Sequence, residues 1–133
     1  MYLIDTNIFL EILLDQQKAD ECQRLLSKVY EGKIFAYVSS FTLHSIEVIL
    51  ERNKLIEALE AFLLDVHKAR GLKRFETSTI EELLALKISK IHKIDFDDAI
   101  QFYICRTYSL DIISFDKHFD GTGIKRLEPK DMT

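Results

Sequence analysis

Short apolar runs alternate with longer amphipathic segments along the 133 residues, and this alternation limits the fold more than any other feature. The runs have the length and the β-branched and aromatic content of buried strands. The predicted strands are Met1–Asp5, Lys33–Ser39, Lys73–Thr77, Leu110–Ser114 and Ile124–Leu127. Between them the apolar residues recur at helical spacing. The predicted helices are Ile8–Leu14, Lys18–Tyr30, Phe41–Leu50, Lys54–Ala69, Thr79–Ile91 and Asp95–Tyr108.

Strands that alternate with helices of this length favour βαβ units and a sheet covered on both faces. We therefore predict an α/β fold, a three-layer α/β/α sandwich with a mostly parallel sheet of four or five strands. In such sheets ligands bind at the carboxyl ends of the strands, where the strand order reverses. The residues that directly follow each strand are consequently the first candidates for function.

The helix boundaries carry recognisable end signals. Gly32 and Gly71 follow two predicted helices, a position that favours glycine. Thr79-Ile80-Glu81-Glu82 predicts a capping box for the fifth helix, and Asp95 is predicted to cap the sixth.

The length fits one domain over residues 1–133. No apolar stretch approaches the roughly 18 residues that a membrane span requires, so we expect a cytoplasmic protein with no membrane partner. Cys22 and Cys105 lie within helical patterns and lack the spacing of a zinc site, which predicts reduced, buried thiols.

The formal charge of −4 is unfavourable for binding to nucleic acid, since cationic contacts to phosphate supply most of that attraction. The distribution of the acids changes this conclusion. If Asp5, Glu47, Asp98 and Asp116 form one cluster, the remaining acids equal the 18 Lys and Arg in number. Divalent cations bound to the cluster would then attract phosphate.

Aspartates occupy three positions at or near the predicted carboxyl ends of the strands. Asp5 follows the first strand, Asp116 lies two residues past the fourth strand, and Asp98 lies in the first turn of the helix before it. Carboxylates suit Mg²⁺ and Mn²⁺, and hydrolysis of a phosphodiester fits such a site. A structural alternative is open for each acid, because Asp near a helix start also acts as a cap or interacts with the helix dipole. An acid beside a buried strand, such as Asp5, needs partners or a metal to offset its desolvation.

Three segments together resemble a known family. They are LIDTN at 3–7, Asp98-Ala99 in a late helix and IISFDKHF at 112–119, and the order, the spacing and the closing Leu127-Glu128-Pro129 agree as well. These segments are similar to the first, third and fourth motifs of PIN domains.

The resemblance implies a metal-dependent endoribonuclease that cuts single-stranded RNA, often the toxin of a toxin–antitoxin pair and commonly a homodimer. Asp5, Asp98 and Asp116 would hold Mg²⁺ or Mn²⁺. Thr6 and Asn7 would brace Asp5, and Ser114 would hold a water or phosphate near Asp116. The expected partners are an RNA substrate and an antitoxin protein.

The chain departs from the family pattern after the second strand. PIN domains usually have a glutamate early in the next helix, where Ser45 stands here, and the nearest acid is Glu47. Residues two apart on a helix point about 200° away from each other, so Glu47 replaces Ser45 only if the helix begins in a shifted register. Glu47 is retained as a catalytic candidate and Ser45 as a supporting one.

Two other classes of function are kept beside the nuclease. The first is a catalytically weak or inactive PIN scaffold that binds RNA or a protein partner, which Ser45 suggests. The second is a phosphatase or phospho-receiver domain, which also places Asp at strand ends. The first strand is followed by Asp5-Thr6-Asn7 rather than by the DxD or the acidic pair that these two classes use.

Overall fold

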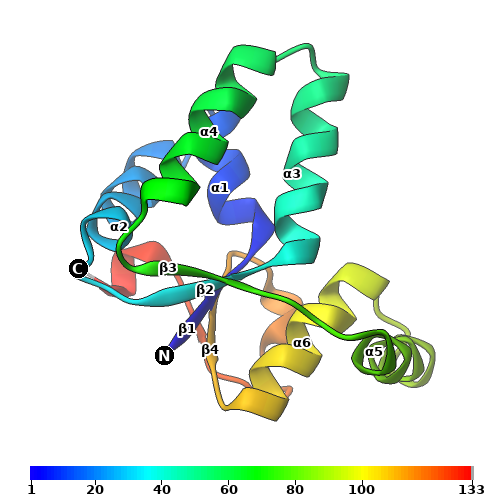
Figure 1. The fold of residues 1–133 in the computed structure, drawn as a ribbon. Coiled ribbons are helices and arrows are strands. Elements are labelled where there is room, and N and C mark those ends of the chain that lie inside the picture. Colours follow the sequence, from blue (N-terminus) through cyan, green and yellow to red (C-terminus); the bar gives the residue numbers. More distant parts are fainter. Residues whose placement is uncertain (133) are drawn as a thin grey trace.

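The computed structural model describes residues 1–132 and contains a fully parallel five-stranded sheet in the order β3-β2-β1-β4-β5 (Figure 1). The strands are β1 Tyr2–Ile4, β2 Ala36–Ser39, β3 Leu72–Phe75, β4 Asp111–Ile113 and β5 Arg126–Leu127. The α-helices are α1 Thr6–Leu13, α2 Ala19–Glu31, α3 Ser40–Arg52, α4 Ile56–Lys68, α5 Thr79–His92 and α6 Phe96–Tyr108. Two short 3-10 helices, η1 Lys117–Phe119 and η2 Pro129–Met132, follow β4 and β5. The predicted α/β fold with a parallel sheet is confirmed.

Helices cover both faces of the sheet. Helices α1, α2, α3 and α4 lie on one side, and α5 and α6 lie on the other (Figure 1). Alternation along the strands serves both layers, because successive side chains of a strand point to opposite faces. In β1, Leu3 packs with α5 and α6, whereas Ile4 packs with α1 to α4. In β4, Ile112 and Ile113 divide in the same way.

The helix ends agree with the sequence signals in part. Gly32 ends α2 in the left-handed conformation with φ 85°. The predicted capping box at Thr79 is wrong by one residue, since Ser78 caps α5 and exchanges hydrogen bonds with Glu81. Asp95 occupies the N-cap position of α6, but its side chain makes no capping hydrogen bond. A hydroxyl can cap from either position, and the backbone conformation at Ser78 decides which one does.

The sequence predicted the third strand with shifted bounds and the burial of both cysteines. The third strand runs over Leu72–Phe75 rather than Lys73–Thr77. Cys22 and Cys105 are buried, unpaired thiols, as predicted. Over residues 1–132, none of the helices has the length and the apolar content that a membrane crossing would require.

Gly71 joins α4 to β3 at a point of close backbone contact. Its N–H donates to Val29 O over 2.9 Å, and its carbonyl accepts from the N–H of Ala36 over 2.8 Å. A Cβ atom at this position would collide with the carbonyl oxygens of Ile34 and Val29. Only glycine therefore allows the edge strand to join the sheet at this register.

We predict that Gly71→Ala destabilises the protein by about 1–3 kcal/mol, the usual effect of forcing extra atoms into a packed site. Urea unfolding followed by circular dichroism measures the change. Ala69→Gly, two residues earlier in the chain, serves as a comparison because this substitution adds no atoms. An unchanged free energy of unfolding in Gly71→Ala would contradict the close contact.

Candidate functional site

The candidate site lies at the carboxyl end of β1 and β4, where the strand order reverses. The chain passes from β1 outward through β2 and β3, then crosses back to place β4 on the other side of β1. Asp5 directly follows β1, and Ser114 and Asp116 follow β4. Asp98 lies in the first turn of α6, in the helical layer on the opposite face of the sheet from α1. The topology thus brings together residues from three segments that are far apart in the sequence.

Asp5 is almost fully buried, with 6% of its surface exposed, and four donors satisfy its carboxylate. Oδ1 accepts from the backbone N–H of Thr6 over 2.8 Å and from Nε2 of Gln101 over 3.2 Å. Oδ2 accepts from Oγ of Ser114 over 2.6 Å and from Nδ2 of Asn7 over 3.3 Å. These bonds offset part of the free energy that burial of a carboxylate costs.

Asn7 and Ser114 connect the end of β1 to the loop after β4. Asn7 donates to Oγ of Ser114 over 3.1 Å and accepts from the N–H of Phe115 over 3.3 Å. Oγ of Ser114 also accepts from the N–H of Asp116 over 2.9 Å. The hydroxyl of Ser114 is therefore engaged with protein groups, and its role beside a water or phosphate stays a prediction.

Gln101 is the main site residue that the sequence reasoning missed. This side chain is 2% exposed and lies on α6, where it donates to Asp5 and, over 3.1 Å, to Oγ1 of Thr42. Its Oε1 accepts from Oγ of Ser39 over 2.9 Å. Thr42 in turn shares a hydrogen bond of 2.9 Å with the hydroxyl of Thr6. The spacing of three residues between Asp98 and Gln101 was the available signal, because it places both on neighbouring parts of one helix face.

A second group of side chains lies beside this network and can hold a cation. Ligand atoms of Asp98, Asp116 and His118 all lie within 4.8 Å of one another. Nδ1 of His118 is 3.1 Å from Oδ1 of Asp116, and the imidazole is 80% exposed. Two carboxylates suit Mg²⁺ or Mn²⁺, which usually takes one or two such ligands together with water and substrate phosphate. The donor set therefore fits the metal that the sequence suggested.

Asp5 is not a member of that group of ligand atoms within residues 1–132. Its charge nevertheless acts on the group, because it contributes to the raised pKa of Asp98. Asp5 faces inward to its four donors, whereas Asp98 and Asp116 are only partly buried. Direct ligation by Asp5 remains a prediction.

Glu47 and Ser45 both lie on α3. Oε1 of Glu47 is 2.9 Å from Nδ1 of His44, one turn earlier on α3. Ser45 lines a shallow hollow on α3 together with Phe41 and Val48. The carboxylates that act on Asp98 are Asp97, Asp116, Asp5 and Asp95. The catalytic part assigned to Glu47 thus remains a prediction without geometric support.

The acids repel one another and are short of solvent. Burial, followed by the charges of Asp97 and Asp116, raises the pKa of Asp98 to about 7. Burial also raises the pKa of Asp5, although hydrogen bonds from Ser114, Gln101 and Thr6 oppose the shift. Both shifts indicate that the charged carboxylates are poorly solvated, so a bound proton or cation would stabilise them.

The sequence of this chain matches the model of a known protein family. The PIN domain model matches residues 2–125, which is most of the chain. This chain belongs to the PIN domain family. A search of curated protein sequences finds no significant match.

Solved structures share the PIN fold at low sequence identity. The toxin VapC20 of Mycobacterium tuberculosis, described as cleaving the sarcin–ricin loop, superposes with a TM-score of 0.80 at 17% identity, covering 97% of this chain and 100% of that one. A toxin–antitoxin complex from Klebsiella pneumoniae gives 0.69 at 17% identity, with 97% and 98% covered. FitAcB from Neisseria gonorrhoeae gives 0.66 at 21% identity, with 98% and 99% covered. These likenesses establish that the whole fold is shared.

We predict that Gln101→Leu destabilises the protein by about 1–3 kcal/mol, because the buried side chains of Asp5, Ser39 and Thr42 each lose one hydrogen bond that the leucine cannot replace. Denaturant unfolding measures the loss. The matched control is Gln23→Leu on the exposed surface of α2, which should stay close to the parent. Equal stability of Gln101→Leu and the parent would contradict the bracing role.

The raised pKa of Asp98 predicts how the stability of the metal-free protein, measured with a chelator present, depends on pH. Between the usual carboxyl range and pH 7 the folded chain keeps a proton that the unfolded chain has lost. Stability must then fall as pH rises through this window. We expect a lower Tm at pH 8 than at pH 5, and a smaller fall in Asp98→Asn, which cannot lose the proton.

Asp20→Asn, an exposed change on α2, is the control and should keep the parent's dependence. A parent and an Asp98→Asn variant with the same change in Tm between the two pH values would contradict the assignment.

Proposed function

We propose that this PIN domain is a metal-dependent endoribonuclease that hydrolyses phosphodiester bonds of single-stranded RNA. The observation that carries the proposal is the convergence of Asp98 and Asp116 at the reversal point of the sheet, within 4.8 Å of each other and of His118. Membership of the PIN family and the toxin structures that share its fold support the same reading.

A divalent cation held by Asp98 and Asp116 would polarise a phosphoryl oxygen and lower the pKa of the attacking water. The chain's own residues prepare this site. Asp116 is fixed through its backbone N–H to Ser114, and Oδ1 accepts from the N–H of His118 over 2.9 Å. Asp98 is fixed by α6, which Gln101 ties to Asp5. The Asp116 carboxylate is thus oriented before a substrate arrives, and the backbone of Asp98 is held by a packed helix.

We further propose that the chain acts as the toxin of a toxin–antitoxin pair in the cytoplasm, as a homodimer with an antitoxin protein as partner. Several structures of the same fold support this, since they contain toxin–antitoxin complexes, including VapBC2 of Rickettsia felis bound to a DNA fragment of its promoter.

One observation favours a second candidate, a PIN scaffold that binds RNA or a protein without cutting. Ser45 stands where the family has a glutamate, and Glu47 pairs with His44. A site with fewer carboxylates would bind the cation more weakly.

We expect purified protein with Mn²⁺ to cleave RNA, and Asp98→Asn and Asp116→Asn each to lower the rate by at least about a hundredfold, because a metal site supplies several kcal/mol of transition-state stabilisation. Gel analysis of labelled RNA measures the rates. Asp65→Asn, an exposed change on α4, should leave the rate unchanged.

Calorimetric titration with Mn²⁺ separates the two candidates. Binding of Mn²⁺ that is lost in Asp116→Asn, together with RNA cleavage by the parent, supports the enzyme. RNA binding without metal uptake or cleavage would favour the scaffold.

A further inference from the structure

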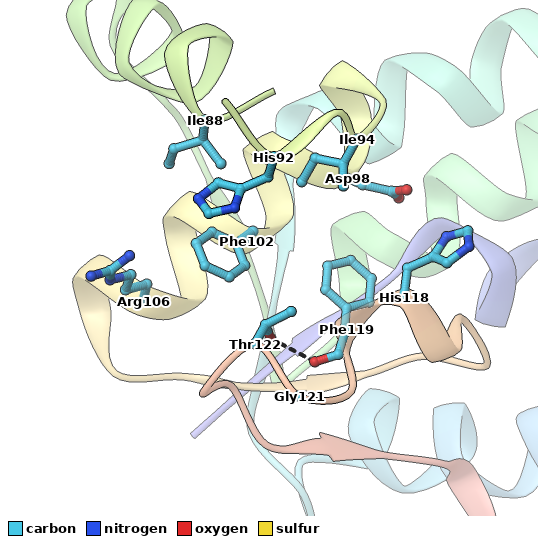
Figure 2. Close-up of a pocket in the computed structure, with 10 residues that line it drawn as sticks. All are labelled: Ile88, His92, Ile94, Asp98, Phe102, Arg106, His118, Phe119, Gly121 and Thr122. Atoms are coloured by element: carbon cyan, nitrogen blue, oxygen red, sulfur yellow. Dashed lines mark hydrogen bonds between the residues drawn. The ribbon is translucent and has the colours of Figure 1, made fainter. Parts of the chain in front are cut away.

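A hollow of about 270 Å³ opens directly beside the aspartate group (Figure 2). Helices α5 and α6 form one wall, and η1 with the turn after it forms the other. Asp98 and His118 belong both to this lining and to the group that can hold a cation. A ligand in the hollow therefore touches the candidate metal site as well.

The floor of the hollow is aromatic. Phe102 is 7% exposed and Phe119 is 2% exposed. Thr122 donates to the carbonyl of Phe119 over 2.6 Å and holds the turn against the floor. Two planar polar groups stand near the ring of Phe102, the imidazole of His92 with its centroid 6.4 Å away and the guanidinium of Arg106 at 5.9 Å.

The charges are separated along the hollow. Figure 2 shows Arg106 at one end and Asp98 with His118 at the other, with Phe102 between them. Asp98 is the only acid in the lining among residues 1–132. Asp98, Phe102 and Arg106 follow one another at intervals of four residues on α6, so they lie along one side of the helix.

These features define the occupant by its chemistry. It has a flat, partly apolar body that fits between aromatic and planar side chains, which is how proteins hold nucleobases. It carries a negative group toward a cation at Asp98 and a second one toward Arg106. The volume of about 270 Å³ lies just below the roughly 300–1,000 Å³ of small-molecule sites, which suits a single base. A nucleotide within a strand meets all three conditions, whereas a peptide side chain does not.

We propose that this hollow binds one nucleobase of the RNA strand, adjacent to the phosphate placed at Asp98 and Asp116, with Arg106 contacting the phosphate on the other side of that base. The placement beside a phosphate that is cut rests on the proposed function, whereas the binding of a base to the hollow can be tested without cleavage.

The test is a nuclear magnetic resonance titration of the metal-free protein with three probes. They are adenosine 5′-monophosphate, ribose 5-phosphate and N-acetyl-tyrosinamide. We expect the adenosine nucleotide to shift the ring resonances of Phe102 and His92 in a saturable way, and ribose 5-phosphate to leave them unchanged. Arg106→Ala should weaken nucleotide binding by about tenfold, the order expected for a lost stacking and ionic contact. Arg24→Ala, an exposed change on α2, should not weaken it.

A second measurement places the base relative to the cut. In an RNA that the protein cleaves, the base is removed at one position at a time. We expect one abasic position beside the cut to lower kcat/KM by about tenfold, and Arg106→Ala to reduce the effect of that removal. His92→Ala provides an independent variant at the same hollow, with the exposed His67→Ala on α4 as its control.

The outcomes separate the two proposals. RNA cleavage with no shift from the nucleotide, or equal shifts from ribose 5-phosphate, overturns the base site and leaves the nuclease standing. Shifts from N-acetyl-tyrosinamide but not from the nucleotide overturn it in favour of a protein partner. Nucleotide shifts without any RNA cleavage support the base site and overturn the proposed function.

Discussion

The buried carboxylate of Asp5 is the constraint on which the rest of the site depends. A carboxylate at the end of a buried strand is costly unless donors surround it. Here the donors come from α1, from the loop after β4 and from α6. Satisfying Asp5 therefore fixes three segments relative to one another. Asp98 and Asp116 take their positions from two of these segments, so the placement of the candidate cation ligands follows from how Asp5 is solvated by the protein.

The same arrangement leaves an electrostatic imbalance. Burial raises the pKa of Asp5, and burial together with neighbouring aspartates raises the pKa of Asp98 to about 7. In the absence of a counter-ion these charges oppose folding at neutral pH. A divalent cation would relieve the repulsion and at the same time turn the edge of the sheet attractive to phosphate. The free energy that the fold loses at this edge thus becomes affinity for the ligand that the site is suited to bind.

The strand-end aspartates could be predicted from the sequence because the parallel topology alone assigns their positions. For Gln101 the only signal was its spacing of three residues from Asp98, since its partners Ser39 and Asp5 are distant in the chain. His118 approaches Asp116 only because a 3-10 turn follows β4. The predicted bounds of the edge strand β3 were shifted, because Lys73 and Arg74 are both exposed and give no alternating pattern. Local periodicity therefore predicts where acids arrive, whereas tertiary packing decides which polar groups meet them.

Helix α6 links the two halves of the site. One side of it carries Gln101 toward Asp5, and the neighbouring side carries Asp98, Phe102 and Arg106 along the hollow. Four residues advance a helix by about 6 Å. Helical geometry therefore sets the distance from Asp98 to the ring of Phe102 and from there to the guanidinium of Arg106. A substrate strand would meet these groups as a rigid series rather than as independent side chains. Any displacement of α6 that followed the loss of the bond from Gln101 to Asp5 would move Asp98 and Phe102 together, relative to Asp116 and Phe119.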